Sequence, residues 1–201
     1  MKARLGVLVS GRGSNFQAIL NSTVDGRLDA EVAVVISNRP EATALDIAKR
    51  RGIPAISIPS KGLDREAYDR LLIEELQKHR IDLVCLAGYM RLLSGVFVAA
   101  FPRKILNIHP SLLPAFPGLD AQHQALTHGV KFSGCTVHFV DEDLDAGPIV
   151  RQAVVAVLDG DTVESLSTRI LAEEHRVYSE AIRTVLSGKY RVEGRRVILG
   201  V

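Results

Sequence analysis

Several protein classes are excluded by what the sequence lacks. It has only two cysteines, Cys85 and Cys135, each among apolar neighbours, which argues against a disulfide framework. Its net charge of +2 gives no excess of the kind that marks nucleic-acid or membrane-surface binding. No apolar run reaches membrane-spanning length, and the N-terminus lacks the charged region and apolar stretch of a signal peptide. These absences predict a cytoplasmic protein whose partners are neither nucleic acid nor a membrane.

Internal repeats, low-complexity segments and linkers are also lacking, and what remains is the composition of a globular domain. With 201 residues, 47% of them hydrophobic, the chain can bury one sizeable core. Apolar strand-like runs alternate with helical segments, which is typical of α/β proteins with a parallel sheet. We therefore expect one domain over residues 1–201, with a Rossmann-like, mostly parallel twisted sheet and helices on both faces.

The expected elements follow from apolar periodicity and from capping residues. Asp64 is placed to cap the third helix, and Asp161 with Glu164 forms a plausible capping box for a long helix that ends at Gly188. A small hairpin is expected to turn at Gly194. Strands are predicted over 4–9, 31–36, 55–58, 83–87, 132–140 and 149–157, and helices from about 16 and over 42–51, 65–79 and 121–127.

A glycine loop, residues 10–15, links the first strand to the first helix. Ser14 or Asn15 can cap that helix, and the exposed N–H groups of such a loop favour an anion such as phosphate. Phe16 replaces the third glycine of a dinucleotide-binding loop, and the second strand ends without the acid that binds an NAD ribose. The loop therefore predicts a phosphorylated small molecule as ligand, and a plain tight turn is the alternative.

The segment 107–114, with sequence NIHPSLLP, is the strongest candidate for chemistry. Asn107 and His109 flank Ile108, so on a strand both side chains share one face while Ile108 enters the core. Ser111 and the prolines then require an irregular loop directly after the strand, where α/β folds place ligands. Such a donor pair suits the oxyanion of an acyl-transfer intermediate, with proton transfer by the histidine. A structural Asn and His in a proline-rich turn is the alternative.

Two further segments are ambiguous on sequence alone. Residues 88–93 follow a buried strand and could form an apolar pocket wall with one cationic side chain, although Met and Leu at this spacing also suit an ordinary core. Residues 141–148 carry acids at 141, 143 and 145, as a calcium loop does. Ala146 and Gln152 replace the required glycine and acid of that loop, which leaves a solvated acidic turn and predicts no metal.

Glu174 is a charge in an unusual place. It falls on the apolar stripe of the long helix, where a buried carboxylate needs a partner. Contact with a ligand and a buried structural ion pair explain it equally well. The other positions of the stripe are Leu166, Ile170, Val177, Ala181 and Val185.

Taken together, four motifs resemble the phosphoribosylglycinamide formyltransferase family along essentially the whole chain. They are SGRGSN at 10–15, AGYMRLL at 87–93, NIHPSLLP at 107–114 and DLDAGP at 143–148, in this order. The resemblance implies a formyltransferase fold and transfer of the formyl group of 10-formyltetrahydrofolate, a co-substrate, to the amine of glycinamide ribonucleotide in purine biosynthesis. It implies no metal, and the expected assembly is a monomer or homodimer.

The resemblance also implies roles for particular residues. His109 would be the general acid, Asn107 would support the formyl oxygen, and Asp145 would pair with His109 and favour its charged form. Arg65 would lie near the glutamate tail of the folate, whose pterin would be read by backbone groups. The implied ribonucleotide site comprises Gly13, Ser14, Asn15, Leu171, Ala172, Glu173 and Glu174. The implied folate site comprises Arg65, Met90, Arg91, Leu92, Leu93, Asn107, Val140, Asp141, Glu142, Asp143, Leu144 and Asp145.

Three other functions are weighed against this interpretation. A formyltetrahydrofolate hydrolase shares the Asn, His and Asp, but its central motif usually reads NIHHSF, against Pro110 and Leu112 here. A methionyl-tRNA formyltransferase is expected to carry a further C-terminal domain. A non-catalytic module that binds a phosphorylated ligand predicts no role for Asp145 beside His109.

Overall fold

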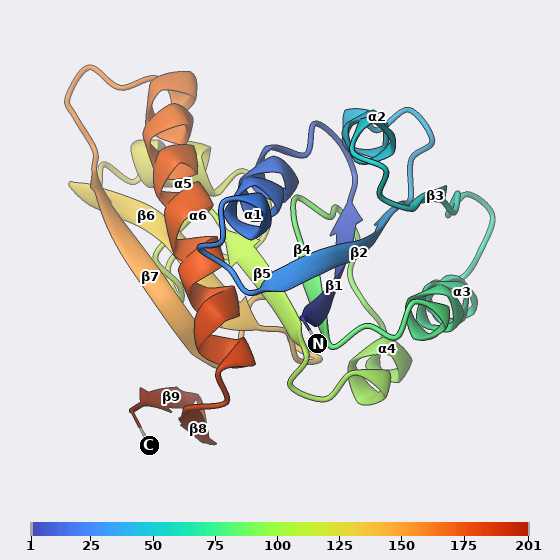
Figure 1. Ribbon diagram of the computed structural model, residues 1–201. Helices are drawn as coiled ribbons and strands as arrows, with labels where there is room; N and C mark the ends of the chain where they lie inside the picture. The colour runs from blue at the N-terminus through green and yellow to red at the C-terminus, as the bar shows by residue number, and fades with distance from the viewer. Residues whose placement is uncertain (1, 201) are drawn as a thin grey trace. The chain divides into compact units, whose positions relative to one another are not determined.

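Apolar strands of the first half of the chain pair side by side in parallel. The computed structural model describes residues 2–200, and its residues up to Asn107 form one compact unit while those from Ile108 onward form another. The first unit contains the strand order β3-β2-β1-β4-β5, with parallel pairing at each step. Its elements are β1 (Ala3–Val9), α1 (Ser14–Val24), β2 (Ala30–Ser37), α2 (Thr43–Arg50), β3 (Ala55–Ser57), α3 (Arg65–Lys78), β4 (Leu83–Leu86), α4 (Gly95–Ala100) and β5 (Ile105–His109), shown in Figure 1.

The central strands of this unit are buried along most or all of their length. In β1 the side chains of Leu5, Val7, Leu8 and Val9 are all fully buried, and β4 is buried at every position. A strand covered on both faces needs apolar side chains on both, which is why these strands read as continuous apolar runs. The parallel α/β class predicted from the sequence is confirmed. The expected single domain over 1–201 stays a prediction.

Two helix starts differ from the sequence prediction. At α1 the cap position is Gly13, in the left-handed conformation with φ 78°, and no side chain caps the helix. The prediction that Ser14 or Asn15 caps it is therefore wrong. At α3 the predicted cap is confirmed, because the Asp64 carboxylate accepts a hydrogen bond of 2.9 Å from Ala67 N–H. Helix α4 was not predicted; the signal for it is Ser94, whose hydroxyl caps it at Phe97 N–H.

The second unit is a mixed sheet covered by the long helix. Strands β6 (Phe132–Phe139) and β7 (Ile149–Ala156) are antiparallel, and α6 (Val163–Leu186) packs on both. Helix α5 (Ala121–Thr127) contacts α6. Strands β8 (Tyr190–Glu193) and β9 (Arg196–Leu199) form the predicted hairpin, which Figure 1 shows beyond the C-terminal end of α6.

The start of α6 is also one residue from its predicted place. Thr162 is the cap, and it exchanges hydrogen bonds with Ser165 in a capping box. Asp161 instead accepts hydrogen bonds from Leu158 N–H and Arg169, and these contacts, that of Arg169 above all, hold the pKa of Asp161 well below its usual value. A capping box is therefore present, but it is formed by Thr162 and Ser165, one residue after the predicted pair Asp161 and Glu164. No helix among residues 2–200 is long and apolar enough to cross a membrane.

Candidate active site

Strand β5 presents its polar side chains as the sequence predicts. Asn107 and His109 lie two residues apart on this strand and so share one face, while Ile108 between them is buried with 7% exposure. Asn107 is half-buried and His109 is only 5% exposed. A polar pair is therefore held at the end of a strand with little contact with solvent.

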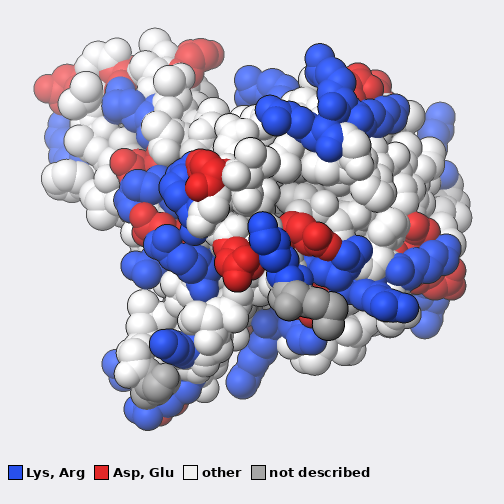
Figure 2. Space-filling view, in the orientation of Figure 1, with Lys and Arg blue, Asp and Glu red and all other residues white. Residues whose placement is uncertain are grey.

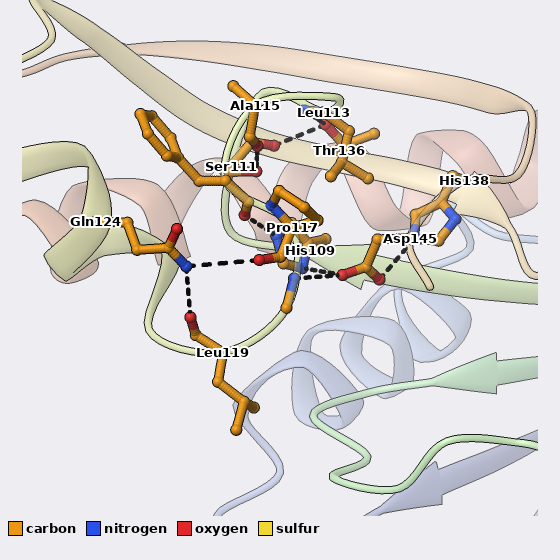
Figure 3. A network of polar contacts seen from close by, with 12 residues as sticks. His109, Ser111, Leu113, Ala115, Pro117, Leu119, Gln124, Thr136, His138 and Asp145 are labelled. Carbon is orange, nitrogen blue, oxygen red and sulfur yellow. Dashed lines mark hydrogen bonds and ion pairs between the residues drawn. The ribbon is translucent and has the colours of Figure 1, made fainter. Parts of the chain in front are cut away.

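Both ring nitrogens of His109 face oxygen atoms (Figure 3). Nδ1 lies 3.3 Å from Oδ2 of Asp145, and Nε2 lies 2.9 Å from the carbonyl oxygen of Phe116. Carboxylate and carbonyl oxygens only accept hydrogen bonds, and only a doubly protonated imidazole has a donor on each nitrogen. Both ring nitrogens of His109 thus face hydrogen-bond acceptors.

Asp145 is placed to remain ionised. It lies in the left-handed conformation with φ 50°, its side chain is 9% exposed, and Oδ2 accepts a hydrogen bond of 2.9 Å from Gly118 N–H. Burial alone would raise the pKa of this carboxyl. The hydrogen bond from His138, that from Gly118 and the charge of His109 outweigh burial and hold the pKa of Asp145 below its usual value.

A second histidine, which the sequence analysis did not identify, shares the same carboxylate. Nε2 of His138 lies 3.6 Å from Oδ1 of Asp145, and its Nδ1 lies 2.9 Å from the carbonyl oxygen of Phe139 (Figure 3). His138 is 2% exposed on β6. Asp145 is thus enclosed between two imidazoles. The only sequence signal for His138 is a histidine inside an otherwise buried strand.

The loop after β5 is fixed by side chains of the neighbouring strands (Figure 3). The Thr136 hydroxyl donates to the carbonyl of Ser111 at 2.7 Å and accepts from Leu113 N–H at 3.0 Å. Gln152 donates to the carbonyl of Leu113 at 3.0 Å, and the Ser111 hydroxyl donates to the carbonyl of Ala115. The irregular loop predicted from the prolines is therefore held firmly, and with it the Phe116 carbonyl.

The acidic turn carries the remaining predicted residues of this unit's site. Val140 and Asp141 are half-buried, and the Asp141 carboxylate accepts a hydrogen bond from Asp143 N–H at 3.2 Å. Glu142, Asp143 and Leu144 are exposed. Within residues 2–200 no three His, Cys, Asp or Glu side chains are grouped as a metal site would require. The turn brings Asp145 to His109 and leaves the preceding side chains open to solvent.

In the first unit the glycine loop packs against the start of α2. Gly11 accepts a hydrogen bond of 3.2 Å from Ala44 N–H, and a Cβ atom on Gly13 would lie 2.6 Å from Cβ of Ala44. Position 13 therefore requires glycine for two reasons: its positive φ and the close approach of Ala44. Ser14 and Asn15 begin α1, Ser14 half-buried and Asn15 8% exposed.

The segment after β4 is less buried than an ordinary core segment. Met90 is 59% exposed and Leu92 is 53% exposed, so the core interpretation is wrong for these two side chains. Arg91 and Leu93 are half-buried, and Arg65 is exposed at the first position of α3. Exposed apolar side chains beside cations are consistent with a wall that a ligand covers.

Glu174 is buried on α6, as its position on the apolar stripe predicts. It is 7% exposed, next to the half-buried Leu171 and Glu173 and the exposed Ala172. Burial above all, together with the negative charges of Glu174 and Glu173, raises the pKa of the Cys135 thiol to about 12. Cys135 therefore stays a neutral thiol, close enough to the carboxyl groups of Glu174 and Glu173 to be affected by them.

Comparisons with known proteins place this arrangement among enzymes. The family model for "Formyl transferase" matches residues 3–182. Phosphoribosylglycinamide formyltransferase of Bacillus subtilis (strain 168) is 40% identical over 191 residues, which cover 94% of this chain and 98% of that protein. The trifunctional purine biosynthetic protein adenosine-3 of Bos taurus is 48% identical over 192 residues, or 95% of this chain, but the chain spans only 19% of that protein's length.

The fold is similar to solved structures as well. The crystal structure of glycinamide ribonucleotide transformylase 1 from Symbiobacterium toebii is 57% identical in sequence and matches with a TM-score of 0.97. The match covers 98% of this chain and 94% of that one. At this similarity the two chains share one fold through nearly every element.

Proposed function

The chain belongs to the formyl transferase family, alongside the phosphoribosylglycinamide formyltransferases, and from this premise we propose its reaction. It transfers the formyl group of 10-formyltetrahydrofolate to the amine of glycinamide ribonucleotide, giving formylglycinamide ribonucleotide and tetrahydrofolate in purine biosynthesis. The observation that carries this proposal is the buried contact of His109 with Asp145, on the strand that also carries Asn107. A module that only binds a phosphorylated ligand predicts no role for Asp145 beside His109.

The chemistry assigns one task to each of the three residues. The substrate amine attacks the formyl carbon, and the carbonyl oxygen becomes an oxyanion in a tetrahedral intermediate. The Asn107 amide and the His109 imidazolium donate hydrogen bonds to that oxygen. The bond from carbon to folate N10 then breaks as N10 takes up a proton relayed from His109, and the attacking amine gives up its own proton, which returns His109 to its protonated form. Asp145 keeps His109 charged until the proton moves.

The Phe116 carbonyl has a part in this mechanism. It accepts the hydrogen bond of His109 Nε2 at 2.9 Å, and so occupies one of the two donor directions of the ring. Asp145 takes the other direction. We expect the substrate oxygen to replace the Phe116 carbonyl at Nε2, while the contact with Asp145 is kept.

The ribonucleotide phosphate is assigned to the glycine loop. Gly13, Ser14 and Asn15 begin α1, and the N–H groups at a helix start favour an anion. Lys and Arg side chains gather over α2, which the loop contacts through Gly11, as Figure 2 shows. Their positive charge would attract a phosphorylated substrate toward this part of the first unit. Leu171, Ala172, Glu173 and Glu174 of α6 are assigned to the same ligand.

The folate is assigned to the exposed apolar and polar groups already described. They are Arg65, the segment Met90–Leu93, Asn107 and the turn Val140–Asp145. Exposed Met90, Leu92 and Leu144 offer apolar surface to the pterin and benzoyl rings, and Arg65 offers charge to the glutamate tail. The enzyme is expected in the cytoplasm, as a monomer or homodimer, without a metal.

A formyl-transfer assay with and without glycinamide ribonucleotide tests the function. The absorbance change on deformylation of 10-formyltetrahydrofolate should require the ribonucleotide and should yield one formylated ribonucleotide for each folate consumed. Equal turnover without the ribonucleotide would favour the formyltetrahydrofolate hydrolase. Binding of the ribonucleotide with no turnover under any condition would favour a non-catalytic module.

Bulk at Gly13 should weaken ribonucleotide binding. In Gly13→Val the new Cβ would collide with Ala44, and the valine would be strained at the left-handed φ of this position. The backbone must therefore move, and the N–H groups of the loop shift with it. We expect the Kd for the ribonucleotide to rise by roughly tenfold or more, with folate binding nearly intact. Isothermal titration with each ligand measures this. Gly11→Ala is the matched control, because no atom lies within 4 Å of a Cβ placed there. Unchanged ribonucleotide affinity in Gly13→Val would remove the assignment.

Glu174→Gln tests whether the buried carboxylate contacts the ribonucleotide. The loss of one charge-assisted hydrogen bond should raise the Kd for the ribonucleotide by roughly ten- to a hundredfold and leave folate affinity unchanged. Glu180→Gln on the same helix is the control, because Glu180 pairs with Arg176 away from the apolar stripe. If Glu174→Gln alters only the melting temperature, Glu174 is a structural ion-pair member instead.

A further inference from the structure

The segment Gly88–Ser94 is fastened at both ends. At its start the Ser10 hydroxyl accepts a hydrogen bond of 2.8 Å from Met90 N–H, and Ser10 N–H donates to the carbonyl of Gly88 at 3.1 Å. At its end the carboxylate of Asp69 accepts a hydrogen bond of 2.6 Å from Ser94 N–H, and both residues are buried. The segment is therefore fixed to the end of β1 at one side and to α3 at the other.

The middle of the segment is fastened by an aromatic ring. The guanidinium carbon of Arg91 lies 4.6 Å from the centre of the Tyr68 ring, within the range of a cation–π contact. Tyr68 is fully buried on α3, and its hydroxyl donates to the carbonyl of Ile58 at 3.0 Å. The ring is thus buried and held at its hydroxyl end, and it presents a fixed face to Arg91.

Within the described part of the chain, the Nε atom of the Arg91 guanidinium makes no hydrogen bond that would draw the side chain away from the Tyr68 ring. Among residues 2–200, the buried Nε atom of Arg91 has no hydrogen-bond acceptor. Tyr89 is 8% exposed, and burial raises its pKa, so it stays a neutral phenol. The face of Tyr68 is therefore the contact that determines where the guanidinium lies.

The direction of Arg91 determines the direction of its neighbours. Tyr89 and Arg91 turn inward, and Met90 and Leu92, which alternate with them, are more than half exposed. Met90 and Leu92 are the chain neighbours of Arg91 on either side, so a change in the direction of Arg91 would also move these two apolar side chains. The ring contact therefore orients the apolar surface of the segment.

We propose that Tyr68 is a positioning residue for the folate co-substrate: its ring holds Arg91 inward and thereby keeps Met90 and Leu92 facing the ligand. This inference rests on the proposed function. Arg65 lies one turn before Tyr68 on the same helix, so α3 orients both the cation assigned to the glutamate tail and the apolar wall. Tyr68 acts through Arg91 and does not touch the folate.

Replacing the ring with a flexible apolar side chain tests the proposal. Tyr68→Met fills the core space without an aromatic face, and we expect it to raise the KM for 10-formyltetrahydrofolate by roughly three- to tenfold. The KM for the ribonucleotide and kcat should stay within about twofold, because their residues are not attached to Tyr68. Tyr68→Phe is the matched control. It keeps the ring and loses the hydroxyl with its hydrogen bond to Ile58, so its melting temperature falls while its folate KM stays near that of the unmodified enzyme.

Arg91→Met provides the second measurement. It removes the charge that the ring holds, so it should raise the folate KM at least as much, and adding Tyr68→Met to it should cause no further increase. An unchanged folate KM in folded Tyr68→Met would overturn the proposal, as would a rise in both KM values together with a fall in kcat. If Tyr68→Met does not fold, an unchanged folate KM in Arg91→Met overturns it. Absence of formyl transfer by the unmodified enzyme would instead overturn the proposed function.

Discussion

Replacement of Asn107 with alanine is expected to lower kcat by about two to three orders of magnitude, with little change in either KM. The amide N–H of Asn107 is assigned to the oxygen that becomes an oxyanion, and one donor of this kind contributes roughly 3 to 4 kcal/mol to the transition state. The contribution is larger in the transition state than in the bound substrate, since the neutral formyl oxygen carries less charge than the oxyanion. The loss therefore falls on kcat and not on binding.

The position of Asn107 makes this donor a rigid one. Its backbone is part of β5, opposite Leu86 of β4, and its neighbour Ile108 is buried. A donor that does not move needs no reorganisation during the reaction, and this is what makes it effective.

Single-turnover kinetics would separate the chemical step from substrate binding in Asn107→Ala. Asn107→Asp is a useful companion, because it keeps the shape of the side chain and replaces the N–H donor with a carboxylate oxygen. Its kcat should fall at least as far, since a negative charge would face the oxyanion. Asn21→Ala, an exposed replacement on α1, controls for the loss of an amide elsewhere. A kcat within about fivefold of the unmodified enzyme for Asn107→Ala would refute the oxyanion role.

Much of the fold is predictable because apolar runs, capping residues and turn glycines in the sequence mark the same elements that the folded chain forms and buries. The continuous apolar runs predict β1 and β4, the Asp64 cap predicts the start of α3, and Gly194 predicts the hairpin turn. The starts of α1 and α6 are less predictable, because several adjacent polar residues can cap a helix and tertiary contacts choose between them. At α6 the contact of Asp161 with Arg169 leaves the cap to Thr162.

The candidate site is predictable only in part, for a similar reason. Spacing on one strand predicts that Asn107 and His109 share a face, and a charge on an apolar stripe predicts that Glu174 is buried. The acceptor at His109 Nε2 is a backbone carbonyl, which no side-chain pattern reveals. The approach of His138 to Asp145 depends on the path of the turn between them, which short-range periodicity does not encode.

Replacement of Asp145 with asparagine should reduce turnover strongly without disturbing the backbone. Asp145 has a positive φ, and asparagine tolerates that conformation as well as aspartate does. The amide oxygen of asparagine can still accept the hydrogen bond from Gly118 N–H, so the turn keeps its contact. What is lost is the negative charge between His109 and His138. The change in rate therefore reports on that charge.

The pH profile should change in a definite direction. With Asp145 ionised, the imidazolium of His109 is favoured, and the enzyme keeps its acid up to a higher pH. Without that charge the high-pH limb of kcat should move to lower pH. Because the pKa of Asp145 is lowered in the fold, its ionised form stabilises the native chain above its ordinary pKa of 3.8, and this stabilisation is lost as the pH falls through the lowered value. Asp145→Asn should therefore flatten the acid limb of the stability curve.

The expected loss in kcat for Asp145→Asn is roughly two to four orders of magnitude, as for general acids in other enzymes. Measurement of kcat from pH 5 to about pH 10 tests both the size of the loss and the shift of the limb. Asp159→Asn is the control, because Asp159 is 94% exposed and pairs with Lys131 on the surface. Near-normal turnover with an unchanged profile in Asp145→Asn would show that His109 needs no carboxylate. The buried pair would then be structural, and the proton would have to reach folate N10 by another route.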